Sequence, residues 1–533
     1  MANLIAEVRV EDKASDDGSI KSRWNKLDSD RTTILQRGRQ CAELTIHALL
    51  PPAGFTENQE LVTPYQGLGA KAVNSLASKL LIAMLAPNTP FFKMTLDNKA
   101  QLQLKEQPEV LDEINSAFAA MERATLKEIE DQGVRVPFGL ALKYLVAIGY
   151  TLIHLPDEGG AITYRPDQFV VVRDPMGTPL EIIVQERIHI SLLPPEIQAE
   201  AAANVRSSDQ TVELYTQVKR KKNLWYVVQE AAGKIIESSR GTYPLDECPW
   251  IAPRWSAIAG ENYGRGHVEE YLGDFRSAES LTQSIVEGSA AAAKVLFLNN
   301  PNGTTNAKRL EKARNGDILP GNKNDIGVLQ LEKFNDFRVA LETLTKLEKA
   351  IEQAFLLMSA VQRDAERVTA EEFRTMVTEL ESTLGGVYSL LSVELQLPFL
   401  KRVQARMRKQ GKLPSLPKNM VKPVITTGVD ALSRSYELTK IEQFLAGLPN
   451  EALSRVKWDV YLKRRATALN VDVEGMIMTD EEFGQMQQQQ MLMQMATQAA
   501  PGMAQEMTKG VMNGPQDGTD AGTRGQQAGG QAL

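Results

Sequence analysis

An apolar seam along residues 337–358 constrains the fold of this chain more than any other feature. Its members alternate steps of three and four residues, the spacing of a heptad repeat: Phe337, Ala340, Leu344, Leu347, Ile351, Ala354 and Met358. Asn335 offers an N-cap oxygen at the start, and polar residues fill the other faces: Glu342, Lys346, Lys349, Glu352 and Gln353. The spacing predicts a helix that packs along one narrow line against another helix.

A second helical pattern, from about His267 to Ala292, precedes the seam. Apolar residues recur there at similar spacing: Val268, Tyr271, Phe275, Ala278, Leu281 and Ile285. Its last turns contain only small residues, namely Gly288, Ser289 and four successive alanines. Such residues let helix backbones approach closely. The two helices therefore form either a hairpin within one subunit or a surface that packs against another subunit.

Residues 294–333 link the two helices. The runs KVLFLNN and IGVLQL enclose a turn at Pro301–Thr304, a short helical stretch and the loop GDILPGNKND, which together predict a small α/β tip. Its basic residues outnumber its acids by seven to four: Lys294, Lys308, Arg309, Lys312, Arg314, Lys323 and Lys333 against Glu311, Asp317, Asp325 and Glu332. This excess indicates either a partner-binding surface or an ordinary solvated face.

The remaining chain is expected to be α+β and mainly helical. At 533 residues it exceeds one ordinary core and is expected to form about three or four structural units. Helical patterns cover 22–50, 73–84, 109–132 and 137–148, and short β-branched and aromatic runs between 150 and 239 then predict an antiparallel sheet. His154 and His189 alternate with apolar neighbours in these runs, so we expect structural roles for both.

The stretch CPWIAPRWSAIAGENYGRGHVEE joins these parts to the first helix of the pair. Trp250, Arg254, Trp255 and Tyr263 suit an interdomain anchor better than base stacking, and its glycines allow a sharp turn. Further on, Thr369 and Glu372 have capping-box spacing. They predict a helix to Gln410, with a weak point at Gly385–Gly386 and a kink at Pro398.

The C-terminal part begins with a predicted strand in MVKPVITTG, which we expect to return to the earlier sheet. Helices follow within 433–500, and the composition after Pro501 is typical of disorder.

Composition narrows the class of function. The longest apolar run, Leu80–Ala86, is far shorter than the ~20 residues of a membrane-spanning helix, and no secretion signal is recognisable. Two cysteines and four scattered histidines support no disulfide framework, metal site or cofactor, and favour a reducing compartment. A net charge of −7 argues against a dedicated nucleic-acid binder, so a local basic feature would have to carry any contact with DNA.

Catalytic motifs are not recognisable in the sequence. It contains no nucleophile elbow, Walker A loop, HExxH or CxxC pattern. Gly67-Leu68-Gly69 has neither a preceding strand nor a third glycine, so it does not predict a phosphate site. An enzyme is therefore disfavoured.

Four stretches carry a family resemblance: APRWSAIAGENYGRGHVEE, RDAERVTAEEFR, VTPYQGLGAKAVNSLASKL and LAPNTPFFKM. Through them, and over nearly its full length, the chain resembles the portal, or head-to-tail connector, proteins of short-tailed, podovirus-type bacteriophages. The resemblance implies a ring subunit, usually one of twelve, at a capsid vertex of the virion, with double-stranded DNA threaded through the ring. During assembly the protein would be in the host cytoplasm.

The resemblance also implies a division of the chain. The regions would be a flexible N-terminus (1–21), a wing (22–264), a first stem helix (265–293), a clip (294–333), a second stem helix (334–358), a tunnel loop (359–368), a return to the wing (369–432), a helical crown (433–500) and a disordered tail (501–533). The implied partners are the major capsid and scaffolding proteins, the terminase motor, a tail adaptor protein and internal core proteins, with no membrane, metal or cofactor.

Candidate site residues follow from these regions. Four basic residues are candidates for contact with DNA in the channel: Lys346, Lys349, Arg363 and Arg367. Five basic residues of the clip are candidates for partner docking: Lys308, Arg309, Lys312, Arg314 and Lys323. Packing of the stem would use five seam residues: Phe337, Leu344, Leu347, Ile351 and Met358.

Two other functions stay open. An oligomeric coiled-coil scaffold without DNA passage fits the seam equally well. A hydrolase of unknown type would need a pocket of converging polar groups that the sequence does not reveal.

Overall fold

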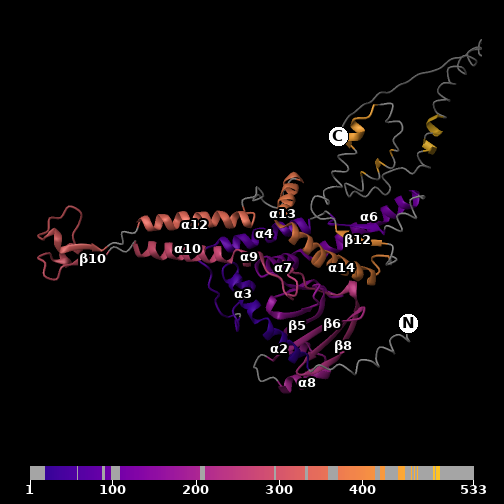
Figure 1. Cartoon of the computed structure of the whole chain (residues 1–533), viewed down its shortest axis with the longest axis horizontal. Helices are drawn as coiled ribbons and strands as arrows, with labels where there is room; N and C mark the ends of the chain where they lie inside the picture. Colours follow the sequence, from indigo (N-terminus) through magenta and orange to yellow (C-terminus); the bar gives the residue numbers. More distant parts are fainter. Residues whose placement is uncertain are drawn as a thin grey trace, which may run out of the picture. The chain divides into compact units, whose positions relative to one another are not determined.

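The computed structural model describes residues 19–56, 58–86, 90–97, 108–204, 210–292, 296–329, 334–357, 370–414, 421–425 and 442–449, with single residues and short pieces between 458 and 491 (Figure 1). Residues 1–437 and 438–533 form two compact units. In the second unit the described residues 442–446 and 488–491 are helical, in agreement with the helices predicted there. The predicted tail at 501–533 lies outside the described residues.

An antiparallel sheet of five strands dominates the first half of the chain. The strands follow one another in sequence order: β4 (Phe169–Arg173), β5 (Pro179–His189), β6 (Thr211–Lys221), β7 (Leu224–Ala231) and β8 (Lys234–Pro244). Alternate side chains of its strands point to opposite faces of the sheet and pack into two different cores. Val170 and Ile183 pack on Trp24, whereas Phe169 and Ile182 belong to the main core. The antiparallel pairing predicted from the β-branched runs is confirmed, but the runs form two sheets rather than one, because Leu152–His154 and Ile162–Tyr164 pair in a separate sheet.

Helices at the N-terminus and between β5 and β6 cover parts of this sheet. They are α2 (Ile20–Asp30) and α8 (Pro195–Asn204), whereas α3 (Thr32–Glu43) follows α2 and contributes Leu35 and Cys41 to the main core. The single helix predicted at 22–50 is wrong: it is interrupted at Arg31 and followed by the short helix η1 (His47–Leu49).

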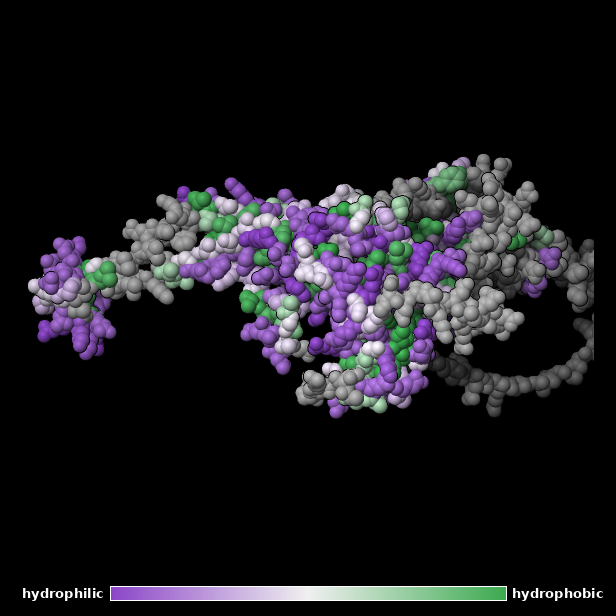
Figure 2. Space-filling model, turned by 60° about the horizontal axis from the view of Figure 1, so that its bottom comes forward, coloured by the Kyte–Doolittle hydropathy of each residue, from purple (hydrophilic) through white to green (hydrophobic). Residues whose placement is uncertain are grey.

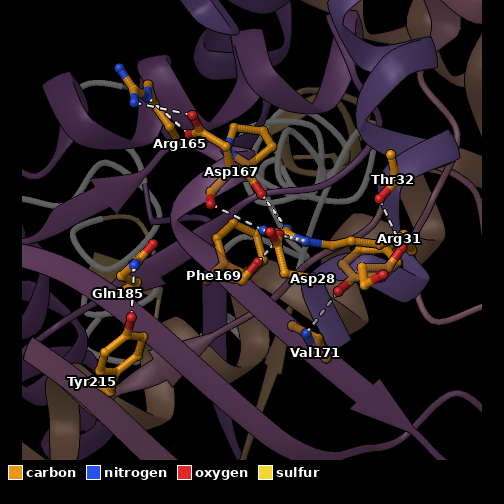
Figure 3. A network of polar contacts seen from close by, with 12 residues as sticks. Asp28, Arg31, Thr32, Arg165, Asp167, Phe169, Val171, Gln185 and Tyr215 are labelled. Carbon is orange, nitrogen blue, oxygen red and sulfur yellow. Dashed lines mark hydrogen bonds and ion pairs between the residues drawn. The ribbon is translucent and has the colours of Figure 1, made fainter. Parts of the chain in front are cut away.

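The interruption at Arg31 has a physical reason. Its guanidinium is buried and donates to the carbonyl oxygens of Pro166 and Asp167 at 2.6 and 3.0 Å, and its Nε donates to Asp28 at 2.9 Å (Figure 3). These carbonyls belong to η2 (Pro166–Gln168), which precedes β4. Arg31 thereby fixes the junction of α2 and α3 to the start of the sheet.

A helical layer forms most of the main core. Its members are α4 (Leu68–Met84), α6 (Pro108–Asp131), α7 (Arg135–Ala147), α13 (Ala370–Leu391), a π-helical segment η7 (Ser392–Gln396) and α14 (Leu397–Lys409). A three-stranded sheet lies beside it, in the order β3 (Ile162–Tyr164), β2 (Leu152–His154) and β9 (Trp250–Ile251). The helices predicted at 73–84, 109–132 and 137–148 are confirmed.

The long helix predicted to end near Gln410 is divided as expected. Leu384 has non-helical φ/ψ, one residue before Gly385, and the π-helical segment comes directly before α14, which has Pro398 in its first turn. Its capping residue Thr369 lies outside the described residues.

The strand predicted at MVKPVITTG exists as β12 (Val421–Ile425), but its expected partner is wrong. It pairs antiparallel with β1 (Phe92–Leu96) rather than with the earlier sheet. Phe92 lies opposite Ile425 and Leu96 opposite Val421. Two segments more than three hundred residues apart thus close this part of the fold.

The chain leaves the core through α9 (His267–Glu270) and α10 (Leu272–Ala292) and returns through α12 (Phe334–Ala354). Figure 1 shows α10 and α12 side by side, and between them the chain forms β10 (Leu296–Asn299), α11 (Ala307–Glu311), η5 (Lys323–Asp325) and β11 (Ile326–Leu329). The predicted helical pair and α/β tip are therefore confirmed. We call α10 with α12 the hairpin, and residues 296–329 the tip.

Within the described residues, no helix is long and apolar enough to cross a membrane, and no group of three His, Cys, Asp or Glu is placed to hold a metal ion. Burial raises the pKa of both Cys41 and Cys248 to about 12, which keeps these thiols neutral and poorly reactive.

Candidate functional site

The two helices of the hairpin pack along the predicted seam. Leu344 and Ile351 of α12 are buried and share one hydrophobic core with Phe275 and Ala278 of α10, while Leu347 is half-buried. The side chain of Phe337 and the whole of Met358 lie outside the described residues. In the described part of α12, the seam therefore packs against α10 of the same subunit.

The opposite face of α12 is basic. At roughly 100° per residue, Lys346 and Lys349 lie about 140–160° around the helix from the line of Leu344 and Ile351. Both lysines are exposed, and Arg338 and Glu342 lie close to the same face. Three cations against one anion give this face a net charge of +2. The other two channel candidates, Arg363 and Arg367, lie outside the described residues.

The C-terminal end of α12 is held by side chains from two other elements. His267 donates from Nε2 to the carbonyl oxygen of Ala354 at 3.0 Å, and the ammonium of Lys79 donates to the carbonyl oxygen of Leu356. Lys79 is only 6% exposed, and its burial lowers its pKa against the opposing effect of Glu379. We call these two donors and the carbonyls they bind the socket.

The backbone within the socket turns sharply. Leu356 has a φ of +57°, the left-handed conformation, and the N–H of Leu357 donates to the carbonyl of Glu352 at 2.7 Å. This is the Schellman arrangement that ends many helices, here without the usual glycine. Aromatic rings pack around the socket: Trp255, His267, Tyr271, Phe275 and Phe355.

The joint before α9 is structural, as expected. Trp255 and Tyr263 are buried, so neither ring is free to stack on a base. Arg254 is buried and forms an ion pair with Glu394 of the π-helical segment, which also accepts the Arg254 backbone N–H at 3.0 Å. Trp250 stacks on His154 with ring centroids 4.4 Å apart and planes 8° from parallel.

The histidines predicted to be structural differ in their surroundings. Burial, with the Arg402 guanidinium adding to it, lowers the pKa of His154 to about 4, so its imidazole is neutral at pH 7. His189 is exposed and its ring Nδ1 accepts the backbone N–H of Ser191 at 3.2 Å. Local structure explains both residues without a ligand.

The tip presents its basic residues to solvent. All five docking candidates are exposed: Lys308, Arg309, Lys312, Arg314 and Lys323. Figure 2 shows the visible face of the tip as mainly hydrophilic. Asp325 differs from the other acids because it is buried, and its carboxylate accepts hydrogen bonds from the backbone N–H and hydroxyl of Thr305 at 3.0 and 2.9 Å. Lys294 and Lys333 lie outside the described residues.

Sequence reasoning missed the socket and a pair of buried arginines. Lys79 follows Leu76 by three residues on the apolar face of α4, a position that could have indicated its burial. Arg402 and Arg406 belong to a basic run that ends the predicted long helix, yet both are buried. Arg402 forms an ion pair with Asp157 at 2.8 Å, and Arg406 donates to the carbonyl of Gly159 at 3.0 Å.

Comparison with known proteins identifies the family. Residues 17–477 match the family model described as "Bacteriophage head to tail connecting protein". The chain is 37% identical to the portal protein of Enterobacteria phage T3 over 491 residues, covering 90% of each chain. It is also 37% identical to the portal protein of Escherichia phage T7 over 493 residues, covering 90% of this chain and 92% of the relative.

More distant relatives agree. The portal protein of Pseudomonas phage phiKMV is 30% identical over 435 residues, covering 80% of this chain and 84% of the relative. Because the family model spans most of the chain and the relatives match nearly end to end, this chain belongs to the bacteriophage head-to-tail connecting proteins and is a portal protein of the podovirus type.

Proposed function

We propose that copies of this chain form a ring at one vertex of a phage capsid and that double-stranded DNA passes through its axis during packaging and ejection. The observation that carries the proposal is the two-faced α12. One face buries Leu344 and Ile351 against α10, and the opposite face exposes Lys346 and Lys349. A helix with these faces can line a channel while its other side packs on protein.

The modest charge of this face suits a conduit. Each phosphate neutralised by a fixed cation adds a salt-dependent increment of affinity, so a continuous basic groove would hold the duplex in place. In a ring, one lysine per subunit already gives a circle of charge. Two lysines on α12 would guide DNA while the acidic remainder of the chain limits other contacts.

The regions of the chain take their roles from this arrangement. Residues 22–264 and 369–432 would be the wing, the hairpin the stem, residues 294–333 the clip, residues 359–368 the tunnel loop and residues 433–500 the crown. The five exposed basic residues of the tip would dock the tail adaptor and the terminase motor at different times. Capsid, scaffolding and internal core proteins are the other proposed partners, and assembly would take place in the host cytoplasm.

We propose no catalytic role for the chain. The relatives reported above are named as portal proteins. The alternative of an oligomeric coiled-coil scaffold without DNA passage gives no reason for the two lysines on the face of α12 opposite the seam. A purified ring that hydrolyses ATP would contradict the assignment of the motor to a separate protein.

The test reverses the charge of Lys346 and Lys349. We expect Lys346→Glu combined with Lys349→Glu to leave ring assembly intact and to change the length or the retention of packaged DNA. The matched control reverses two exposed lysines elsewhere, Lys93→Glu with Lys127→Glu. Electron microscopy checks the rings, and gel analysis of DNA from assembled particles gives the readout. Packaged DNA of unchanged length and stability in the α12 variant would contradict the proposed channel face.

A further inference from the structure

One apolar side chain stands out in the basic tip. Ile318 is 97% exposed, the largest exposure among the described large apolar residues. It follows a closed turn in which Asp317 accepts the backbone N–H of Arg314 at 2.7 Å and returns its own N–H to the Arg314 carbonyl at 3.1 Å. Pro320, two residues later, restricts the backbone of Leu319. The loop thus presents Ile318 from a constrained backbone.

The base of this loop is also fixed. Thr305 Oγ1 accepts the backbone N–H of Asn322 at 2.8 Å and donates to the buried Asp325 at 2.9 Å. A Cβ added to Gly303 would lie 2.5 Å from Asp325 Cγ, and one added to Gly321 would lie 2.6 Å from Thr305 Oγ1. Such close contacts leave the two ends of the loop little freedom, so a partner would meet a preorganised surface.

The charge of the tip that carries Ile318 is mainly positive. Asp325 is buried and accepts hydrogen bonds from Thr304 and Thr305, and the bond from the Thr305 hydroxyl lowers the pKa of its carboxyl, so its negative charge counts in the charge of the tip. The exposed acids of the described tip are Glu311 and Asp317, against five exposed cations. Five cations against these two acids and Asp325 give the described tip a net charge of +2, and Ile318 is its most exposed apolar side chain.

We propose that Ile318 is the apolar anchor of the tip and inserts into a pocket with an acidic rim on a protein partner. This inference rests on the docking role proposed for the tip and adds the chemistry of the partner. Interfaces concentrate their energy in a few desolvated apolar or aromatic anchors surrounded by a polar rim. DNA would satisfy the cations but would leave Ile318 without a pocket, so the observations favour a protein.

The test measures binding of full-length rings to the purified tail adaptor protein of the same phage. The variants are Ile318→Asp, Ile318→Leu and a tip replacement in which an Asn-Gly turn joins Asn299 to Ile326. These two residues face each other across β10 and β11, so a two-residue turn can close the hairpin. The control is Ile258→Asp, at an isoleucine that is 42% exposed in a loop outside the tip.

We expect the Ile318→Asp ring to bind the adaptor at least about 30-fold more weakly, the loss typical of a hot-spot residue. Ile318→Leu and Ile258→Asp should stay within about threefold of the unmodified ring, and higher salt should weaken binding of the unmodified ring.

The remaining outcomes separate the two proposals. Unchanged adaptor binding by Ile318→Asp, together with lost binding by the tip replacement, overturns the anchor and leaves the docking role standing. Retained binding by the tip replacement overturns both. Failure of Ile318→Asp to form rings would mean that Ile318 packs between copies of the chain. If Ile318→Asp weakened binding of the ring to a short DNA duplex as much as it weakened binding to the adaptor, the surface would be assigned to nucleic acid. Either result overturns the anchor.

Discussion

At the scale of single residues, the close contact between the end of α7 and the chain just before α9 requires a glycine. Gly149 has a φ of +103°, and a Cβ added there would lie 2.3 Å from the backbone carbon of Arg265. A side chain at this position would meet both a strained conformation and a backbone clash. The glycine-rich stretch before α9 therefore packs directly against Gly149, which follows α7. The sequence did not predict this contact.

We predict that Gly149→Ala lowers the free energy of unfolding by about 3 kcal/mol or more, since neither chain segment can move without disturbing the core. Chemical denaturation of the full chain gives the value. Gly160→Ala is the control, because no atom lies within 4 Å of a Cβ added at Gly160. Equal unfolding midpoints for the two variants would contradict this account of the joint.

His154 makes stability depend on pH. Its pKa in the folded chain, about 4, lies below the value of 6.5 expected in an unfolded chain, so the unfolded state binds more protons between these values. Stability therefore falls as the pH drops from 6.5 to 4, by up to about 3 kcal/mol from this group.

Replacing His154 with Gln should remove this contribution. We expect the difference in unfolding free energy between wild type and His154→Gln to change by 1–3 kcal/mol, roughly, between pH 7 and pH 4, with the variant less sensitive to acid. Denaturation at several pH values measures it. Parallel pH profiles for the two proteins would show that His154 is not buried in its neutral form.

At the scale of elements, the sequence predicts a helix well when its apolar residues recur at regular spacing. It does not predict contacts between segments that are far apart in the chain. The seam of α12 could be predicted because each apolar residue faces the same side of one helix. Its socket could not, because Lys79 comes from α4 and His267 from α9. The pairing of β1 with β12 was missed for the same reason, since strand partners far apart in sequence leave no local pattern.

The socket gives a prediction for the end of α12. Lys79→Met keeps an apolar stem but removes the donor to the Leu356 carbonyl, which costs about 1–3 kcal/mol when a buried acceptor is left unsatisfied. We expect backbone amides of residues 352–357 to exchange hydrogen about tenfold faster or more.

Hydrogen exchange followed by mass spectrometry checks this expectation. Lys71→Met, at an exposed lysine of the same helix, is the control. Exchange at 352–357 that is the same in both variants would mean that Lys79 does not hold the end of α12.

At the scale of the whole molecule, the order of parts carried more information than any single motif. The four stretches that resemble portal proteins extend from Val62 to Arg374, and the family match extends over residues 17–477. Fold class and family could thus be predicted from the sequence. The candidate channel site could be predicted only in part. Periodicity gives the face of α12 that carries Lys346 and Lys349, but the direction of that face in a ring depends on neighbouring copies.

The central claim is that this portal protein forms a ring with a DNA channel. Electron microscopy of the purified full-length chain tests it most directly, through the symmetry of the particles and the width of their axial opening. We predict closed rings, most of them with twelve-fold symmetry, whose open centre is wide enough for a DNA duplex. Particles without a continuous axial channel, or open assemblies without rotational symmetry, would contradict the account.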